Sequence, residues 1–120
     1  MIRYHDISDG TRIAEITTES EIINSPQDML DIMADIGYGG CNNIIIHKQV
    51  LHQDFFDLKT GLAGEILQKF SNYRMRLAIV GDYSQITSRS LNDFIRESNR
   101  SGVISFIESF EAAVLNFSGK

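Results

Sequence analysis

The segment from Asp57 to Glu65 holds the side chains best placed to do chemistry. Asp57, Lys59 and Thr60 directly precede a predicted helix, and Glu65 falls in its first turn. The first turn of a helix has unpaired backbone N–H groups, which can bind an anion or a partner's carboxylate, and Lys59 adds positive charge beside them. The segment is therefore the predicted functional centre, a binding site for a ligand or a partner.

Two glycines, Gly61 and Gly64, lie three residues apart in the same segment and fall on one helical face. Glycine near a helix start costs up to about 1 kcal/mol relative to alanine, so each needs a compensating reason. One reason is close packing of the helix on the sheet. The other is open access of a ligand to the backbone. The sequence leaves both open.

Aromatic, acidic and basic side chains flank this centre. We expect Phe55 and Phe56 to be presented to a partner by the loop that precedes the helix. Asp82 follows the next buried strand, and Arg96 belongs to the charged end of a later helix, which is usually solvated. The predicted ligand- or partner-binding residues are Phe55, Phe56, Asp57, Lys59, Thr60, Gly61, Gly64, Glu65, Asp82 and Arg96.

The sequence gives little support for a metal site or for a reactive cysteine. His47, His52 and Asp54 are ligand types that suit zinc, but their spacing matches no strong metal-binding signature. Cys41 is the single cysteine, so an internal disulfide is excluded, and it is expected to be a small, partly buried thiol. The sequence predicts no metal and no cofactor.

The elements that position these residues can be read from hydrophobic periodicity. Two alternating segments, Ile2 to Ile7 and Arg12 to Thr17, flank Asp9-Gly10 and predict an antiparallel hairpin. Ser25-Pro26 is typical of a helix start, with Ser25 as the N-cap. The following apolar positions have the helical period, and they are Met29, Ile32, Met33 and Ile36.

Unbroken apolar runs predict buried strands further along. Asn43 to His47 and Arg76 to Gly81 have no polar alternation, as expected for parallel strands covered on both faces. The remaining predicted elements are helices over Gly61 to Tyr73, with Thr60 as N-cap, and Ser88 to Ser98, a strand over Val103 to Phe106, and a final helix bearing Phe110, Val114 and Phe117. The order ββαβαβαβα predicts one α/β domain over residues 1–120, with a mixed, mostly parallel sheet and an N-terminal antiparallel hairpin.

Composition limits the classes of partner. The formal net charge of −5 and the lack of a basic face argue against nucleic-acid binding, since the densest basic stretch, Lys69 to Arg76, fits a helix C-terminus. No apolar run approaches the roughly 20 residues of a membrane helix, and the first residues do not resemble a signal peptide. We therefore expect a cytoplasmic protein that binds neither nucleic acid nor membrane.

Three blocks of sequence resemble a bacterial family described only as a domain of unknown function, DUF4180. They are DFFDLKTGLAGE (Asp54–Glu65), QKFSNYRMRLAIVGD (Gln68–Asp82) and DFIRESNR (Asp93–Arg100). The similarity extends over nearly the whole chain. The resemblance implies family membership without an assigned activity.

A weaker resemblance is to the STAS domains, the fold of bacterial anti-sigma-factor antagonists. Those domains carry a phosphorylatable Asp-Ser-Ser-Gly motif before the helix that follows a central strand, and the stretch Asp57 to Leu62 occupies the comparable place. If Thr60-Gly61 matches Ser-Gly, the phosphoacceptor position falls on Lys59. The resemblance therefore implies a STAS-like fold and places phosphorylation-dependent partner switching in doubt.

Two functional hypotheses remain. The first is a non-enzymatic regulatory or interaction module that binds a protein partner or a small-molecule ligand and that could form a homodimer. The alternative is a small enzyme or sensor for a polar anionic small molecule, in which Asp57, Lys59 or His47 acts on the substrate while Arg96 and Arg100 hold the anionic group. The sequence does not decide whether there is any catalysis.

Overall fold

The chain begins with an antiparallel β-hairpin, as predicted. The computed structural model describes residues 2–118, and Met1, Gly119 and Lys120 lie outside the described part. Strand β1 (Ile2–Asp6) pairs with β2 (Arg12–Ile16), with Ile2 opposite Ile16 and Asp6 opposite Arg12. The predicted hairpin is therefore confirmed, and β1 forms one edge of the sheet.

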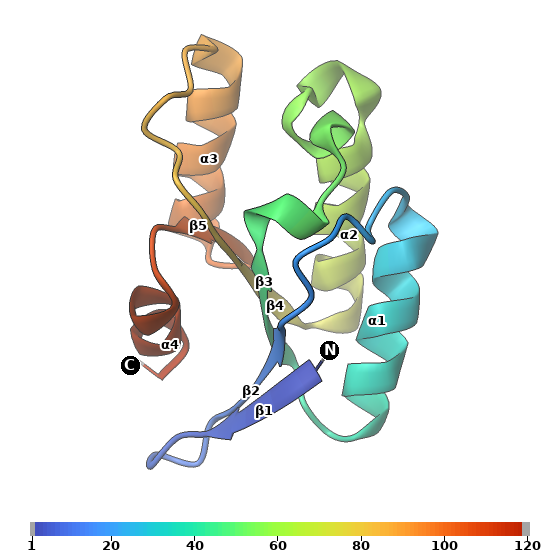
Figure 1. Cartoon of the computed structure of the whole chain (residues 1–120), viewed down its shortest axis with the longest axis vertical. Helices are drawn as coiled ribbons and strands as arrows, with labels where there is room; N and C mark the ends of the chain where they lie inside the picture. Colours follow the sequence, from blue (N-terminus) through green and yellow to red (C-terminus); the bar gives the residue numbers. More distant parts are fainter. Residues whose placement is uncertain (1, 119–120) are drawn as a thin grey trace.

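Of the five strands within residues 2–118, four run parallel. The sheet order β1-β2-β3-β4-β5 follows the sequence, with β3 (Asn43–His47), β4 (Arg76–Val80) and β5 (Ile104–Ile107) beside β2 (Figure 1). Ile44 lies opposite Leu77, and Ile46 lies opposite Ile79. The two unbroken apolar runs are thus adjacent parallel strands, and the predicted α/β fold class is confirmed.

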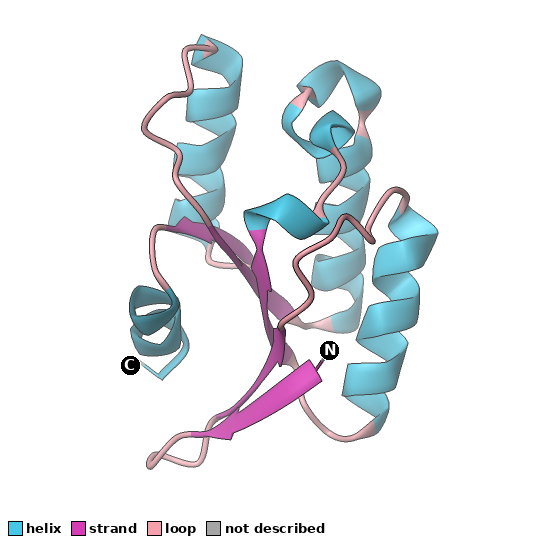
Figure 2. Cartoon of the chain, viewed as in Figure 1, coloured by secondary structure: helices cyan, strands magenta, loops and turns pink. Residues whose placement is uncertain are grey.

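In the described part of the chain, three helices cover one face of this sheet and one helix covers the other. They are α1 (Pro26–Tyr38), α2 (Leu62–Tyr73), α3 (Arg89–Ser101) and α4 (Phe110–Ser118). Because right-handed crossovers connect strands that are added in the same direction, α1, α2 and α3 fall on one face. Figure 2 shows α4 on the side of the sheet opposite α1 and α2. Within residues 2–118, no helix is both long and apolar enough to cross a membrane.

The core has two parts because β3 and β4 alternate their side chains between the two faces. On the side of α1 and α2, the strand residues pack against Met29, Met33, Ile66 and Phe70. On the side of α4, Ile13, Ile45 and Ala78 pack against Ala113 and Phe117. Both faces of the central strands are therefore buried.

Of the two predicted helix caps, one is confirmed and one is wrong. Ser25 accepts a hydrogen bond from the Asp28 backbone at 3.2 Å, so the predicted cap of α1 is confirmed. Thr60 is not the N-cap of α2, because Gly61 occupies that position with a φ of 81°. Thr60 still accepts a bond from the Leu62 backbone at 3.3 Å.

The structure requires a glycine at only one of the two glycine positions of the predicted centre. Gly61 needs the left-handed backbone conformation that turns the chain into α2, and this conformation favours glycine. Gly64 is exposed, and a Cβ atom added there would meet no atom within 4 Å. The packing explanation for Gly64 is therefore wrong, since nothing lies close enough to require a glycine.

These environments predict opposite effects of alanine. Gly64→Ala should stabilise the fold by about 0.5 to 1 kcal/mol, because alanine favours a helix and fills only open space. Gly61→Ala should destabilise it by about 1 to 2 kcal/mol, because an L residue is strained at that φ. Urea unfolding followed by circular dichroism measures both free energies of unfolding. A loss of stability in Gly64→Ala would mean that α2 packs closely there.

Candidate functional site

The loops at the carboxyl ends of the parallel strands bring most of the predicted site residues to one edge of the sheet. Phe56, Asp57, Lys59 and Asp82 all lie on the loops that follow β3 and β4. The loop after β3 consists of three short 3₁₀ helices, η1 (Lys48–Val50), η2 (Gln53–Phe56) and η3 (Leu58–Thr60). We call this region the carboxyl edge.

The charge of Arg96 is paired on its own helix and not with a residue of the carboxyl edge. It lies within α3 and forms an ion pair with Asp93 on the same helix at 2.8 Å. Both side chains are more than half exposed, and Arg100 forms a similar pair with Glu97 at 3.0 Å. These contacts are those of a solvated helix surface.

Lys48 is the most firmly held cation of the edge, and it was absent from the predicted site. Its Nζ atom lies 5.3 Å from the centre of the Phe56 ring and 5.1 Å from that of Tyr83. Nζ also donates a hydrogen bond to the Asp82 carbonyl oxygen at 3.1 Å. The ammonium charge is therefore stabilised within the edge itself.

Gly81 makes this position of Lys48 possible. A Cβ atom at Gly81 would lie 2.7 Å from Lys48 Cβ and 2.9 Å from its Cδ, closer than real contacts allow. The Lys48 stem therefore packs on the bare backbone at the end of β4. A glycine directly after a buried strand was the sequence signal that could have pointed to such a close approach.

Two neighbouring side chains have shifted pKa values. Burial raises the pKa of Tyr83, whose hydroxyl donates to the Ile79 carbonyl at 2.8 Å. Hydrogen bonds from the Ser84 hydroxyl and backbone lower the pKa of the exposed Asp82 carboxyl, and the charge of Lys48 acts in the same direction. Tyr83 is thus held neutral and Asp82 ionised.

Phe56 separates two shallow hollows. The first has a volume of about 480 Å³ and lies between η1, η2 and the start of the loop after β4, where Glu21, Gln49, Gln53 and Asp82 line it. The second, of about 410 Å³, lies between η3 and the start of α3 and is lined by Asp57, Lys59, Ser88 and Ser90 among others. Phe56 is half-buried and contributes to both walls.

Phe55 takes the opposite orientation from its neighbour. Its side chain is only 1% exposed, with its ring centre 6.2 Å from that of Phe106 in the core. The expectation that Phe55 is presented to a partner is therefore wrong. Successive side chains of the 3₁₀ turn η2 point in different directions, so only one of the two rings can remain at the surface.

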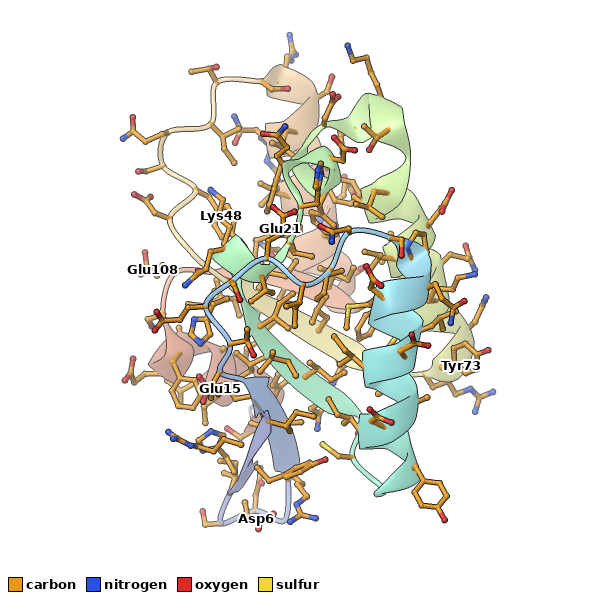
Figure 3. The ribbon with its side chains drawn as sticks, turned by 45° about the vertical axis from the view of Figure 1, so that its right-hand side comes forward. Asp6, Glu15, Glu21, Lys48, Tyr73 and Glu108 are labelled. Atoms are coloured by element: carbon orange, nitrogen blue, oxygen red, sulfur yellow. The ribbon has the colours of Figure 1, made fainter. Side chains whose placement is uncertain are left out.

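The charge of the carboxyl edge is mainly acidic. In the loops that follow β2, β3, β4 and β5, Lys48 and Lys59 are the only lysines or arginines. Figure 3 labels Glu21, Lys48 and Glu108 in the same part of the view, and Glu21 and Lys48 line the first hollow together. The exposed acidic residues of these loops are Glu19, Glu21, Asp54, Asp57, Asp82 and Glu108.

A second polar cluster lies on the face of the sheet that α4 covers. Glu15 Oε1 is 2.9 Å from His5 Nε2, and Glu15 Oε2 is 2.8 Å from His47 Nε2. The three residues come from β1, β2 and β3, and the His5 ring also contacts Phe110 with centres 5.0 Å apart. We call this set the histidine–glutamate cluster.

Only His47 of this cluster was considered from the sequence. His5 and Glu15 face each other because the hairpin register places them on the same side of the sheet, a relation that needs the pairing to be known. Burial acts to raise the pKa of the Glu15 carboxyl, but the two imidazole hydrogen bonds outweigh it and lower that pKa. Glu15 is therefore ionised at neutral pH.

A further cavity lies away from the carboxyl edge and from the histidine–glutamate cluster. It has a volume of about 610 Å³ at the opposite end of the sheet, between the C-terminal ends of α1 and α2. Met33, Tyr38, Tyr73 and Met75 line it, with Tyr38 almost fully exposed. It contains none of the predicted site residues. Among residues 2–118, no group of three or more His, Cys, Asp or Glu side chains is arranged to hold a metal ion.

This geometry defines an α/β protein whose parallel strands end at one polar edge of the sheet. A family model, Domain of unknown function (DUF4180), matches residues 8–116, so the chain belongs to that family. The match includes the carboxyl edge as well as Glu15 and His47. No curated protein and no solved structure matches the chain. The resemblance to STAS domains stays a hypothesis.

The lowered pKa of Glu15 predicts a dependence of stability on pH. Its ionised form stabilises the fold above the ordinary pKa of a glutamate, and this contribution is lost as the pH falls through the lower pKa of the folded protein. Glu15→Gln should therefore reduce the free energy of unfolding by about 1 kcal/mol at pH 7 and by less near pH 3. Urea unfolding at several pH values tests this.

Glu111→Gln is the matched control for this experiment, because Glu111 is exposed on α4 and outside the cluster. It should change stability little at either pH. Equal losses in Glu15→Gln at pH 7 and pH 3 would show that the carboxylate charge does not stabilise the hairpin.

Proposed function

We propose that the protein is a non-catalytic interaction module whose carboxyl edge binds a basic segment of a protein partner. The observation that carries this proposal is the position of Phe56, half-buried between two shallow hollows and surrounded by exposed acidic side chains. An aromatic side chain among charges of one sign is a suitable contact for the stems and charged ends of lysine and arginine.

Charge complementarity supports a basic partner. Exposed carboxylates from all four loops meet at this edge, whereas Lys48 is already bound to the Asp82 carbonyl and covered by two rings. A cationic partner would therefore meet negative potential, which increases the rate of encounter and favours it over an acidic competitor.

The arrangement of the candidate catalytic groups favours binding over catalysis. Asp57 Oδ1 accepts a bond from the Lys59 backbone at 3.3 Å and thereby caps its own turn. His47 is bound to Glu15 on the α4 side of the sheet, whereas Lys48 and Phe56 belong to the other side. Of the groups that the enzyme hypothesis invokes, Asp57 and Lys59 line the second hollow together, whereas His47 is bound elsewhere and Arg96 and Arg100 are paired on α3.

The alternative of an anionic small molecule has one feature in its favour. Lys59, Ser88 and Ser90 line the second hollow together, and this set could receive an anionic group near the start of α3. Arg96 and Arg100 are engaged in ion pairs on α3. Among the side chains that line this hollow, Lys59 is the cationic one.

Selection from a random peptide library displayed on phage tests the proposal without a known partner. Peptides enriched on the wild-type protein should carry net positive charge. The double variant Glu21→Lys, Asp54→Lys should bind the best of them about tenfold more weakly in fluorescence anisotropy, since two attractive charges become repulsive. The matched control Asp31→Lys, Asp35→Lys places the same charges on exposed positions of α1 and should change affinity less than twofold.

Three outcomes would contradict the proposal. They are enrichment of acidic or uncharged peptides, no enrichment at all, and equal losses in the two double variants. Competition by millimolar inorganic phosphate that is abolished by Lys59→Gln would instead support the anionic alternative.

A further inference from the structure

We infer that His5, Glu15 and His47 form a proton-controlled charge switch that weakens binding at the carboxyl edge as the pH falls. The inference rests on the proposed function and adds its regulation. The cluster lies at the carboxyl ends of β2 and β3, and His47 is followed directly by Lys48, which lines the first hollow. The switch is therefore built into the strand that leads to the binding site.

The geometry of the cluster fixes which imidazole atoms take up protons. An ionised carboxylate only accepts hydrogen bonds, so each Nε2 atom at 2.8 or 2.9 Å from Glu15 must carry a hydrogen. The unprotonated nitrogen of each neutral ring is then Nδ1. A proton can bind there while both bonds to Glu15 remain, so the cluster changes its charge without coming apart.

Protonation of both imidazoles reverses the net charge of the histidine–glutamate cluster. With neutral imidazoles the cluster carries the single negative charge of Glu15, and with both imidazoles protonated it carries a net positive charge. Histidine is the side chain whose ordinary titration falls between pH 5 and pH 8. The side chains of His5 and His47 are 26% and 27% exposed, so protons can reach them from solvent.

The groups that face the cluster from the packed strands and from α4 are basic or apolar. On β1, Arg3 lies opposite Glu15 and adds another cation, while β4 places Val80 opposite His47. Helix α4 contributes the Phe110 ring, and its Glu111 is exposed. Glu108, in the loop between β5 and α4, and the other exposed carboxylates of the carboxyl edge are the acidic groups at this end of the sheet (Figure 3).

Positive charge that develops beside an acidic edge opposes a basic partner. Exposed charges act over roughly 8 to 10 Å at physiological salt, which spans the step from the end of β3 to the η1 turn that begins at Lys48. The affinity of the selected basic peptide should therefore be about fivefold lower at pH 5.5 than at pH 7.5, at constant ionic strength.

Histidine variants separate this switch from other effects of pH. The double variant His5→Gln, His47→Gln should retain less than a twofold difference between the two pH values. His52→Gln measures the contribution of the third histidine, which lies outside the cluster on the carboxyl edge, where its Nδ1 accepts a bond from the Asp54 backbone at 2.9 Å and lies 3.6 Å from Asp54 Oδ1. It should keep most of the wild-type difference. Loss of the difference in His52→Gln, or its persistence in the double variant, would overturn the inference.

A readout that needs no peptide distinguishes failure of the switch from failure of the proposed function. Long-range ¹H–¹⁵N NMR spectra of the imidazoles should show the Nε2–H form of His5 and His47 at pH 7.5 and doubly protonated rings at pH 5.5. An Nδ1–H form at pH 7.5, or rings that stay neutral at pH 5.5, would contradict the switch even where peptide binding is confirmed. Absence of peptide binding at both pH values with the expected spectra would contradict the proposed function alone.

Discussion

The addition of each parallel strand beside the previous one is the constraint on which the rest of the structure depends. Right-handed crossovers between β2, β3, β4 and β5 place α1, α2 and α3 on the same face, so α4 is the helix that covers the other face in the part of the chain that the structure describes. The same order directs all the loops that follow these strands to one edge. Acidic side chains that are far apart in the sequence are therefore placed at the same edge of the sheet.

Close packing at the end of β4 shapes this edge. The stem of Lys48 occupies the space that a side chain at Gly81 would need, and its charge is covered by Phe56 and Tyr83. Phe56 is thereby held between two hollows while Phe55 enters the core. A loop built from 3₁₀ turns thus supplies both a core residue and a surface residue, and the proposal of a basic partner rests on the acidic charges around that surface residue.

The sequence predicted the elements that depend on local patterns. Asp9-Gly10 between alternating segments, Ser25 before Pro26, and the run Ile44 to Ile46 each led to an element that the structure confirms. Such signals act within a few residues and do not depend on the rest of the fold. The carboxyl edge could also be located, because parallel strands that alternate with helices end at the same side of the sheet.

Features that depend on pairing or on side-chain direction could not be predicted in the same way. The approach of Glu15 to His5 and His47 requires the register of three strands, and the burial of Phe55 requires the orientation of a 3₁₀ turn. Gly64 satisfied a spacing that is typical of close packing, yet its surroundings are open. The spacing of residues predicts on which face of a helix or strand they lie. It does not predict which residues pack against that face.

Mapping the binding surface by NMR tests the central claim most directly. Titration of ¹⁵N-labelled protein with the selected basic peptide should shift the backbone amide signals of Gln49, Gln53 and Asp82, which line the first hollow. Signals of Tyr38, Tyr73 and Met75, around the cavity at the opposite end, should remain in place. Shifts confined to that second group would contradict the assignment of the carboxyl edge as the binding surface.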